Sequence, residues 1–556
     1  MENTKQSPYE ADDYMKNIII NTEPELITFL LDILEYGENI ESEEILLGDS
    51  SYKILYLLLK NILPLTVLVE EKYIDKIYRD SYYMHFSCKH GEYSRFCKRL
   101  FVFSGNIFEK LDCYNFCDLS TKKLQDNFVG TIVIRPLRGG KIGRCLLNPH
   151  FLLKDKNIYL RYARYSATVY GKRLQINAFP FSMQDGETTT CAEVTILNLM
   201  DYFGKKYCEY RSILPSDIVS IVEKNDFERA LPTRGLKYVT ITKVFSEMGF
   251  YPRLYAKKLF ADGSQFKRVM HYYIESGIPV AMGVKVDEKT KHSVVCIGHG
   301  EINYKDIGKK IYAIYDKEIG NYIWIVDSSD LCRNYIMMDD GKVPYEEMEW
   351  KVEKSHNINI SDKHILGDYE PEVLMVPLYK RMFLEAQDAY DISTSALASK
   401  NIGIQKFYPN IGSKEKPVII RLFMCSSRNY KYQRMSNLSK KNEYLCKVYN
   451  KLRLPRFIWV CEIYDEKGYR GGKANGEIVI DATSSPDYGT KSILLFHYPY
   501  YVLMCHKNIE NVGMLFGNDE VFEKLDKWEP IDSYNHNLHL PENKIDRKST
   551  RLNSSH

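Results

Sequence analysis

The sequence predicts an α+β fold, because a strongly amphipathic helix precedes several β-branched strands in the middle of the chain. The helix is expected at residues 191–203. The strands after it are expected at residues 280–286, 293–297, 311–315 and 322–326. The 556 residues leave room for about two to four domains. Hydrophobic residues (44%) and charged residues (27%) occur in the proportions of folded globular proteins, so we expect little disorder.

The N-terminal region, residues 1–125, is expected to be mainly helical. Thr22 before an acidic turn suits a helix N-cap. The apolar residues that follow recur at helical spacing, three and four apart: Ile27, Leu30, Leu31, Ile33 and Leu34. A strand at residues 128–134 ends at Pro136 and a Gly139-Gly140 turn, which marks the start of the next unit.

Residues 126–377 form the predicted α+β unit, and residues 378–545 a predicted β-rich C-terminal module. Turn residues separate the strands of this module. These strands are expected at residues 418–423, 457–464, 477–480 and 492–504.

The charge balance gives no support to nucleic acid as a partner. Lys and Arg number 76 and Asp and Glu number 73, a net charge of +3, whereas binding to a phosphate backbone calls for a basic excess. A membrane span is also not expected, because the most apolar stretch, residues 54–69, is interrupted by Lys60, Asn61 and Pro64. A span needs roughly 18 uninterrupted apolar residues. We interpret the stretch as a buried helix.

The two ends of the sequence bear on compartment and on processing. The first residues, MENTKQSPYEADDY, lack the basic and apolar segments of a signal peptide, so a cytoplasmic protein is expected. The 13 cysteines are scattered, with one close pair at Cys113 and Cys117, and should be reduced there. Residues 546–556, DRKSTRLNSSH, resemble a translated sequencing adapter, and we leave them out of the fold.

Cys191 opens the predicted amphipathic helix. The apolar face of this helix consists of Ala192, Ile196, Leu199, Met200 and Phe203. Residues 188–190 are threonines that can cap its start. The unpaired N–H groups and the positive dipole at a helix N-terminus stabilise a thiolate, the reactive form of cysteine. Cys191 is therefore a candidate nucleophile.

Three further residues could complete a thiol site. His292 follows a polar turn and opens a strand, so it can act as the base. Asp327 ends an apolar strand and can orient the imidazole, although Asp316, which ends the strand before it, competes for this role. Gln184, shortly before the helix, can donate a hydrogen bond to a developing oxyanion together with the backbone N–H of Cys191.

This order of residues resembles the papain-like cysteine peptidases, and most of all the compact bacterial branch that includes the bacteriocin-processing peptidase domains of exporters. The segment Leu231-Pro-Thr-Arg-Gly235-Leu236 is similar to the linking helices of that branch. The resemblance spans residues 180–377. It implies that Cys191 is the nucleophile, His292 the general base and acid, Asp327 the orienting carboxylate and Gln184 the oxyanion donor. The expected reaction is cleavage of a bond in a peptide or protein substrate, peptide or isopeptide, with no metal or other cofactor.

Other interpretations stay open at this point. The same triad could transfer an acyl group to an amine, as in transglutaminases, and Cys191 could simply be packed in the core of an inactive interaction scaffold. His299 competes with His292 as the base. The residues His85, Cys88, His90 and Cys97, with the Cys113/Cys117 pair, could be read as zinc ligands, but the tight Cys-x2-Cys spacing is missing.

Overall fold

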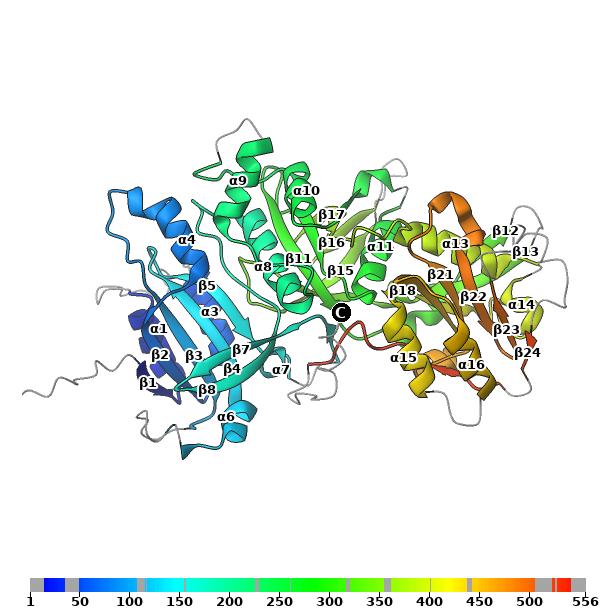
Figure 1. Cartoon of the computed structure of the whole chain (residues 1–556), viewed down its shortest axis with the longest axis horizontal. Coiled ribbons are helices and arrows are strands. Elements are labelled where there is room, and N and C mark those ends of the chain that lie inside the picture. Colours follow the sequence, from blue (N-terminus) through cyan, green and yellow to red (C-terminus); the bar gives the residue numbers. More distant parts are fainter. Residues whose placement is uncertain are drawn as a thin grey trace, which may run out of the picture.

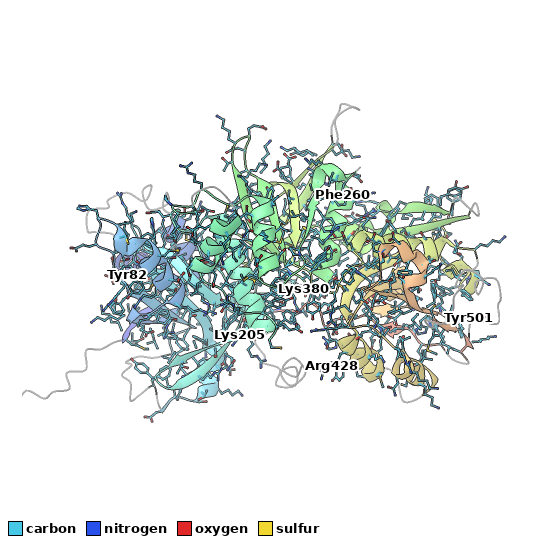
Figure 2. The ribbon with its side chains drawn as sticks, turned by 45° about the horizontal axis from the view of Figure 1, so that its top comes forward. Tyr82, Lys205, Phe260, Lys380, Arg428 and Tyr501 are labelled. Carbon is cyan, nitrogen blue, oxygen red and sulfur yellow. The ribbon has the colours of Figure 1, made fainter. Side chains whose placement is uncertain are left out.

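The computed structural model describes residues 15–35, 50–107, 116, 118–154, 157–225, 230–260, 262–316, 321–354, 362–400, 402–437, 443–505, 523–525 and 528–541. It is a mixed α and β structure, in which three sheets follow one another along the long axis (Figure 1). In Figure 2, the labels Tyr82, Phe260 and Tyr501 mark the N-terminal, middle and C-terminal units. The adapter-like residues 546–556 lie outside the described residues. In the described part of the chain, no helix combines the length and apolarity that a membrane crossing requires.

The N-terminal unit contains a five-stranded antiparallel sheet with the strands in sequence order. Its strands are β1 (Met15–Ile20), β2 (Leu65–Tyr73), β3 (Cys97–Ser104), β4 (Phe128–Arg135) and β5 (Lys141–Leu147). Its helices are α1 (Glu23–Ile33), α3 (Ser50–Lys60), α4 (Lys76–Met84) and α6 (Thr121–Asn127). Helices are present in residues 1–125 as expected, and the Thr22 cap of α1 is confirmed, but the prediction missed the sheet beside them.

The error has a physical cause at β2. Residues 65–69 are all buried, so the strand shows no alternation of polar and apolar residues and resembles a continuation of the preceding helix. The expected boundary at residue 125 is also wrong, because β4 and β5 pair with β3 and complete the N-terminal sheet.

The middle unit carries an antiparallel sheet in the order β16-β15-β14-β11-β10-β17-β9. Its strands are β9 (Arg253–Ala256), β10 (Val280–Lys285), β11 (Lys291–His299), β14 (Asn334–Met338), β15 (Glu346–Glu353), β16 (Lys363–Leu366) and β17 (Glu370–Val376). The short β6 (Tyr159–Leu160) also pairs with β11. The helices are α8 (Cys191–Lys206), α9 (Pro215–Asn225), α10 (Tyr238–Glu247) and α11 (Gly263–Glu275). The helix expected at Cys191 is thus confirmed, and it packs against β11 (Figure 1).

The C-terminal unit is built on a sheet in the order β12-β13-β18-β19-β21-β22-β23-β24. Its strands are β12 (Tyr312–Asp316), β13 (Asn321–Asp327), β18 (Val418–Ser426), β19 (Phe457–Tyr464), β21 (Gly476–Asp481), β22 (Ile493–Tyr498), β23 (Tyr501–Met504) and β24 (Glu523–Lys524). The strands expected at residues 418–423, 457–464 and 477–480 are confirmed, whereas residues 492–504 form two strands, β22 and β23, that pair as a hairpin. However, β12 and β13, which we expected in the middle unit, belong here because β13 pairs in parallel with β18.

Helices cover both faces of this sheet. Phe423 packs with α15 (Ser427–Asn437) and α16 (Glu443–Lys451), whereas its neighbour Leu422 packs with α13 (Ala386–Ala398). Successive side chains of a strand point to opposite faces, so the C-terminal unit is a layered α/β structure rather than a purely β-rich module.

A buried network of ion pairs ties the middle unit to the C-terminal sheet. Arg421 of β18 pairs with Glu275 at the end of α11 (2.6 Å) and with Glu462 of β19 (2.9 Å). Arg434 of α15 pairs with Glu462 and with Glu477 of β21, both at 2.7 Å. Because buried charges need partners, this network specifies how the two units meet.

Candidate active site

The N-terminus of α8 is held by a reciprocal set of side-chain contacts. The backbone N–H of Thr190, the N-cap residue, donates to the carboxylate of Glu193 (3.0 Å), and the Thr233 hydroxyl donates to the other oxygen of this carboxylate (2.5 Å). Cys191 is the first residue of the helix and is half-buried. Its thiol therefore lies at the positive end of the helix dipole, as the sequence predicted.

The loop before α8 is organised by the buried carboxylate of Asp185. This carboxylate accepts the backbone N–H groups of Glu187 (2.9 Å), Thr188 (2.7 Å) and Thr189 (2.9 Å). The guanidinium of Arg135 lies 3.5 Å from its other oxygen. Burial alone would raise the pKa of Asp185, but Arg135 and the hydrogen bonds outweigh burial and hold the pKa below its usual value. These contacts therefore hold the loop before Cys191 in a defined conformation.

The Asp185→Asn variant should unfold more easily than the wild type by about 1–3 kcal/mol near neutral pH, because hydrogen bonds to an ionised group are lost. A lowered folded-state pKa means that the carboxylate stabilises the fold above its unfolded-state pKa of roughly 3.9. This stabilisation disappears as the pH falls through the lower, folded-state pKa. Urea unfolding at neutral and acid pH measures both effects. Asp368→Asn, at a side chain that is 84% exposed, should change neither, and equal losses in both variants would contradict the assignment.

The N-terminal unit also contacts this loop. The Glu187 carboxylate pairs with His85 (2.8 Å) and with Lys89 (2.5 Å), which both follow α4. The Thr188 hydroxyl donates to Ser81 of α4 (3.0 Å). The loop is therefore held from outside the middle unit.

His292 lies near the start of β11, next to a carboxylate at the end of the adjacent strand. Its Nε2 is 2.8 Å from Oδ1 of Asp339, which directly follows β14. Asp339 is fully buried and is fixed in turn by the Tyr369 hydroxyl (2.6 Å) and the backbone N–H of Gly341 (2.9 Å). A carboxylate held in this way orients the imidazole and stabilises its charged form.

The thiol of Cys191 lies beside the same imidazole and contributes to raising its pKa. One helical turn beyond Cys191, the Thr195 hydroxyl lies 3.0 Å from the hydroxyl of Ser293, the residue after His292, so α8 and β11 are fixed relative to each other. Burial would lower the pKa of His292, but the interactions with Asp339 and Cys191 outweigh burial and raise the pKa to about 10. Because Nε2 faces the carboxylate, Nδ1 is the ring nitrogen left for the thiol. An imidazolium in this position favours the thiolate.

Asp327 does not take part in this arrangement, so its assignment as the third residue is wrong. It ends β13 in the C-terminal sheet and accepts hydrogen bonds from the Tyr272 hydroxyl and from the backbone N–H (2.9 Å) and hydroxyl (2.6 Å) of Ser329. The competing Asp316 ends β12, which pairs with β13 and belongs to the same distant sheet. The sequence does contain a signal for Asp339, since it too follows an apolar strand.

Gln184 lies at the exposed start of the Asp185 loop. Its backbone N–H faces the carboxylate of Asp340, the neighbour of Asp339. Its side chain is exposed, which suits a group that contacts a bound substrate, and its role as oxyanion donor stays a prediction.

His299, the competing base, and the candidate zinc ligands make other contacts. His299 is buried and pairs with Glu275 at 3.0 Å. His85 pairs with Glu187, Cys88 is exposed and Cys97 is buried in β3. Cys113 and Cys117 lie outside the described residues. Within the described ranges, His85, His90, Cys88 and Cys97 do not form a group that could hold a metal ion.

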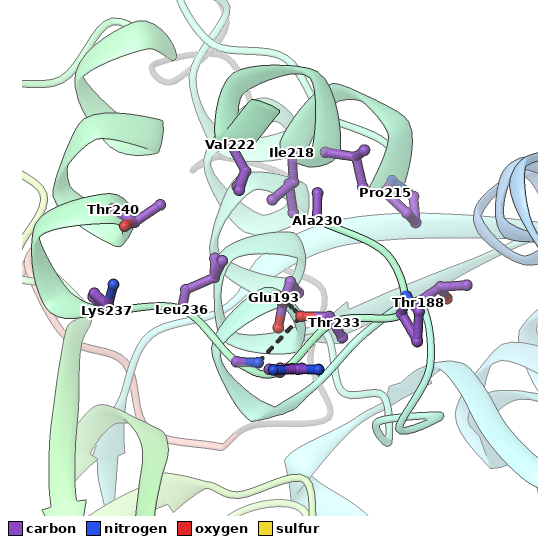
Figure 3. A pocket seen from close by; sticks show the side chains of 14 residues that line it. Thr188, Glu193, Pro215, Ile218, Val222, Ala230, Thr233, Leu236, Lys237 and Thr240 are labelled. Carbon is purple, nitrogen blue, oxygen red and sulfur yellow. Dashed lines mark hydrogen bonds between the residues drawn. The ribbon is translucent and has the colours of Figure 1, made fainter. Parts of the chain in front are cut away.

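A cavity of about 280 Å³ adjoins the N-terminus of α8 (Figure 3). Its apolar wall consists of Ile218 and Val222 of α9 with Leu236, and Glu193 of α8 reaches its floor. The cavity is also lined by Thr188 and Thr233, which belong to the contacts that hold the start of α8. It can receive an apolar side chain beside this end of the helix.

No protein-family model matches this chain, and no curated protein matches it either. The class of the site therefore rests on its own geometry, in which a buried carboxylate hydrogen-bonds an imidazole that lies beside a thiol.

Proposed function

We propose that the protein is a papain-like thiol hydrolase that cleaves a peptide or isopeptide bond in a peptide or protein substrate. The observation that carries this proposal is the imidazole of His292, which pairs with the buried Asp339 carboxylate and lies beside the Cys191 thiol at the start of α8. Nucleophile, base and orienting group in this order are the parts that covalent acyl transfer requires. In this proposal Asp339 replaces Asp327 as the third residue.

The geometry supports the following sequence of steps. The Cys191 thiolate attacks the substrate carbonyl, and the electron pair moves to the carbonyl oxygen, where the backbone N–H of Cys191 and the side chain of Gln184 would stabilise it. His292 then protonates the leaving amine, which departs and leaves a thioester. Water, deprotonated by His292, attacks the thioester and releases the acid and the free thiol.

Iodoacetamide should alkylate Cys191 well below pH 8.5, roughly the pKa of an ordinary thiol, because the His292 imidazolium favours the thiolate. The variants Asp339→Asn and Asp327→Asn form a matched pair, since both remove a buried carboxylate. We expect at least a tenfold slower alkylation at pH 6 for Asp339→Asn and no comparable change for Asp327→Asn. Peptide mass spectrometry identifies the labelled cysteine. Loss of reactivity in Asp327→Asn alone would overturn the assignment of Asp339.

The two alternative functions, an acyltransferase and an inactive interaction scaffold, predict different reactions of Cys191. An acyl group loaded on Cys191 from p-nitrophenyl acetate should be released by water; release that depends on added amines would favour an acyltransferase. If Cys191 reacts no faster than the exposed Cys88 and Cys208, the protein is an interaction scaffold rather than an enzyme.

A further inference from the structure

Asp340, directly beside the Cys191–His292–Asp339 triad, has no role in the steps above. It is 6% exposed, and its carboxylate oxygens make no close hydrogen bond among the described residues, although the backbone N–H of Gln184 faces them. Its Oδ1 lies 3.3 Å from Nε2 of His292. A buried carboxylate with so little compensation is costly, so a bound cation would stabilise it.

The three side chains at this point are arranged as metal ligands. The ligand atoms of His292, Asp339 and Asp340 all lie within 4.8 Å of one another. Zinc binds nitrogen and oxygen at about 2.0–2.2 Å in a tetrahedron, which places neighbouring ligand atoms roughly 3.3 Å apart. Of the two separations from Nε2, the one to Asp340 (3.3 Å) already fits and the one to Asp339 (2.8 Å) must widen by about half an ångström.

The chemistry of the donors also fits a divalent cation. Two carboxylates balance a charge of +2, and an imidazole nitrogen selects zinc-class ions over magnesium or calcium. The Tyr369 hydroxyl and the Gly341 N–H already hold the Asp339 carboxylate in place, as outer contacts do in metal sites. The side chain of His292 is 14% exposed, which leaves a side open for entry and for a water ligand.

We propose that His292, Asp339 and Asp340 bind one zinc-class divalent cation, and that this cation switches the thiol site off. Binding at Nε2 displaces the proton that His292 shares with Asp339, and this proton goes to solvent. The remaining ring proton stays on Nδ1, on the side of Cys191, so the ring is no longer the imidazolium that stabilises the Cys191 thiolate, and it has no free nitrogen that could take the proton of the thiol. The switching half of the inference rests on the proposed function, whereas the binding half does not.

The site differs from a zinc adduct of the catalytic pair itself. Such an adduct needs the Cys191 sulfur, whereas the proposed cation lies on the opposite nitrogen of the ring and needs Asp340. The variants Cys191→Ala and Asp340→Asn therefore separate the two possibilities. The Asp340→Asn variant should fold, because it removes a buried charge that lacks a close hydrogen bond and keeps the size of the side chain.

Calorimetric titration of the full chain with zinc chloride provides the test. We expect the wild type and Cys191→Ala to bind one zinc equivalent that Asp340→Asn binds at least tenfold more weakly; the surface variant Asp368→Asn should match the wild type. Zinc binding that is lost in Cys191→Ala and kept in Asp340→Asn overturns the proposal. The chain contains 13 cysteines, which can also bind zinc. The test is therefore the difference in zinc binding between the variants, not the total amount of zinc bound.

The switching half is tested by alkylation of Cys191 in the presence of zinc. Zinc should slow alkylation at least tenfold in the wild type and much less in Asp340→Asn. Equal rates with and without zinc in a wild type that binds the ion would overturn the switch. A failure of the proposed function appears differently, as a Cys191 that is unreactive even without zinc.

Discussion

Replacing Cys191 by alanine is expected to lower the rate of amide or ester hydrolysis by at least about 10⁴-fold, because the covalent intermediate can no longer form. The fold should remain intact, since the change removes a single sulfur atom from a side chain that is only half-buried at the first position of α8. Hydrolysis of p-nitrophenyl acetate and of fluorogenic peptides measures the loss, and thermal unfolding checks the fold.

The matched control is Cys208→Ala, which removes an exposed thiol close to the end of α8. This variant should keep the activity of the wild type. If both variants retain full activity, Cys191 is not the nucleophile. If both variants lose activity, the loss reflects a disturbed fold rather than the removal of a nucleophile.

Replacing Arg434 by methionine is expected to reduce the free energy of unfolding by about 3–5 kcal/mol, because the change leaves Glu477 buried without its cation and Glu462 with Arg421 alone. The Arg434 side chain is 1% exposed, and its partners Glu462 and Glu477 are fully buried. Burial would raise the pKa of Glu477, but Arg434 and two tyrosine hydroxyls outweigh burial and lower it, so the loss of Arg434 leaves burial less opposed. Urea unfolding at neutral pH measures the difference.

An exposed ion pair on a short helix serves as the control. Arg470 pairs with Glu466 at 2.7 Å, with side chains that are 47% and 55% exposed. Pairs of this kind contribute at most about 1 kcal/mol, so Arg470→Met should have a small effect. An equally small effect of Arg434→Met would show that the buried network does not hold the sheet.

The parts of the fold that the sequence predicted are those with a clear local period. The helix that begins at Cys191 and the strand Phe457–Tyr464 were found because their apolar positions and turn residues agree with one structure only. The sheet of the N-terminal unit was missed because β2 is buried along its centre and shows no alternation. The Thr22 cap was found beside it because a capping box is a local signal.

The residues of the candidate site, too, could be predicted only where the signal is local in the sequence. Cys191 and His292 were found from their places at the start of a helix and of a strand. The third residue was assigned to Asp327 because β13 follows β11 in the sequence, and the sequence carries no sign that β13 pairs with β18 in another unit. Asp339 follows β14, the strand that does pair with β11. Choosing between two strands that both end in a carboxylate requires knowledge of which strands are neighbours.

The contacts of Ser81, His85 and Lys89 with the loop before Cys191 have a consequence for the way the chain can be divided. These residues come from the N-terminal unit, yet they hold the segment that positions the nucleophile. The proposed catalytic site is therefore assembled by two units, and a change that separates the N-terminal sheet from the middle unit would alter the surroundings of the Cys191 thiol without any direct contact with it. A middle unit that existed alone would need other contacts to hold this loop.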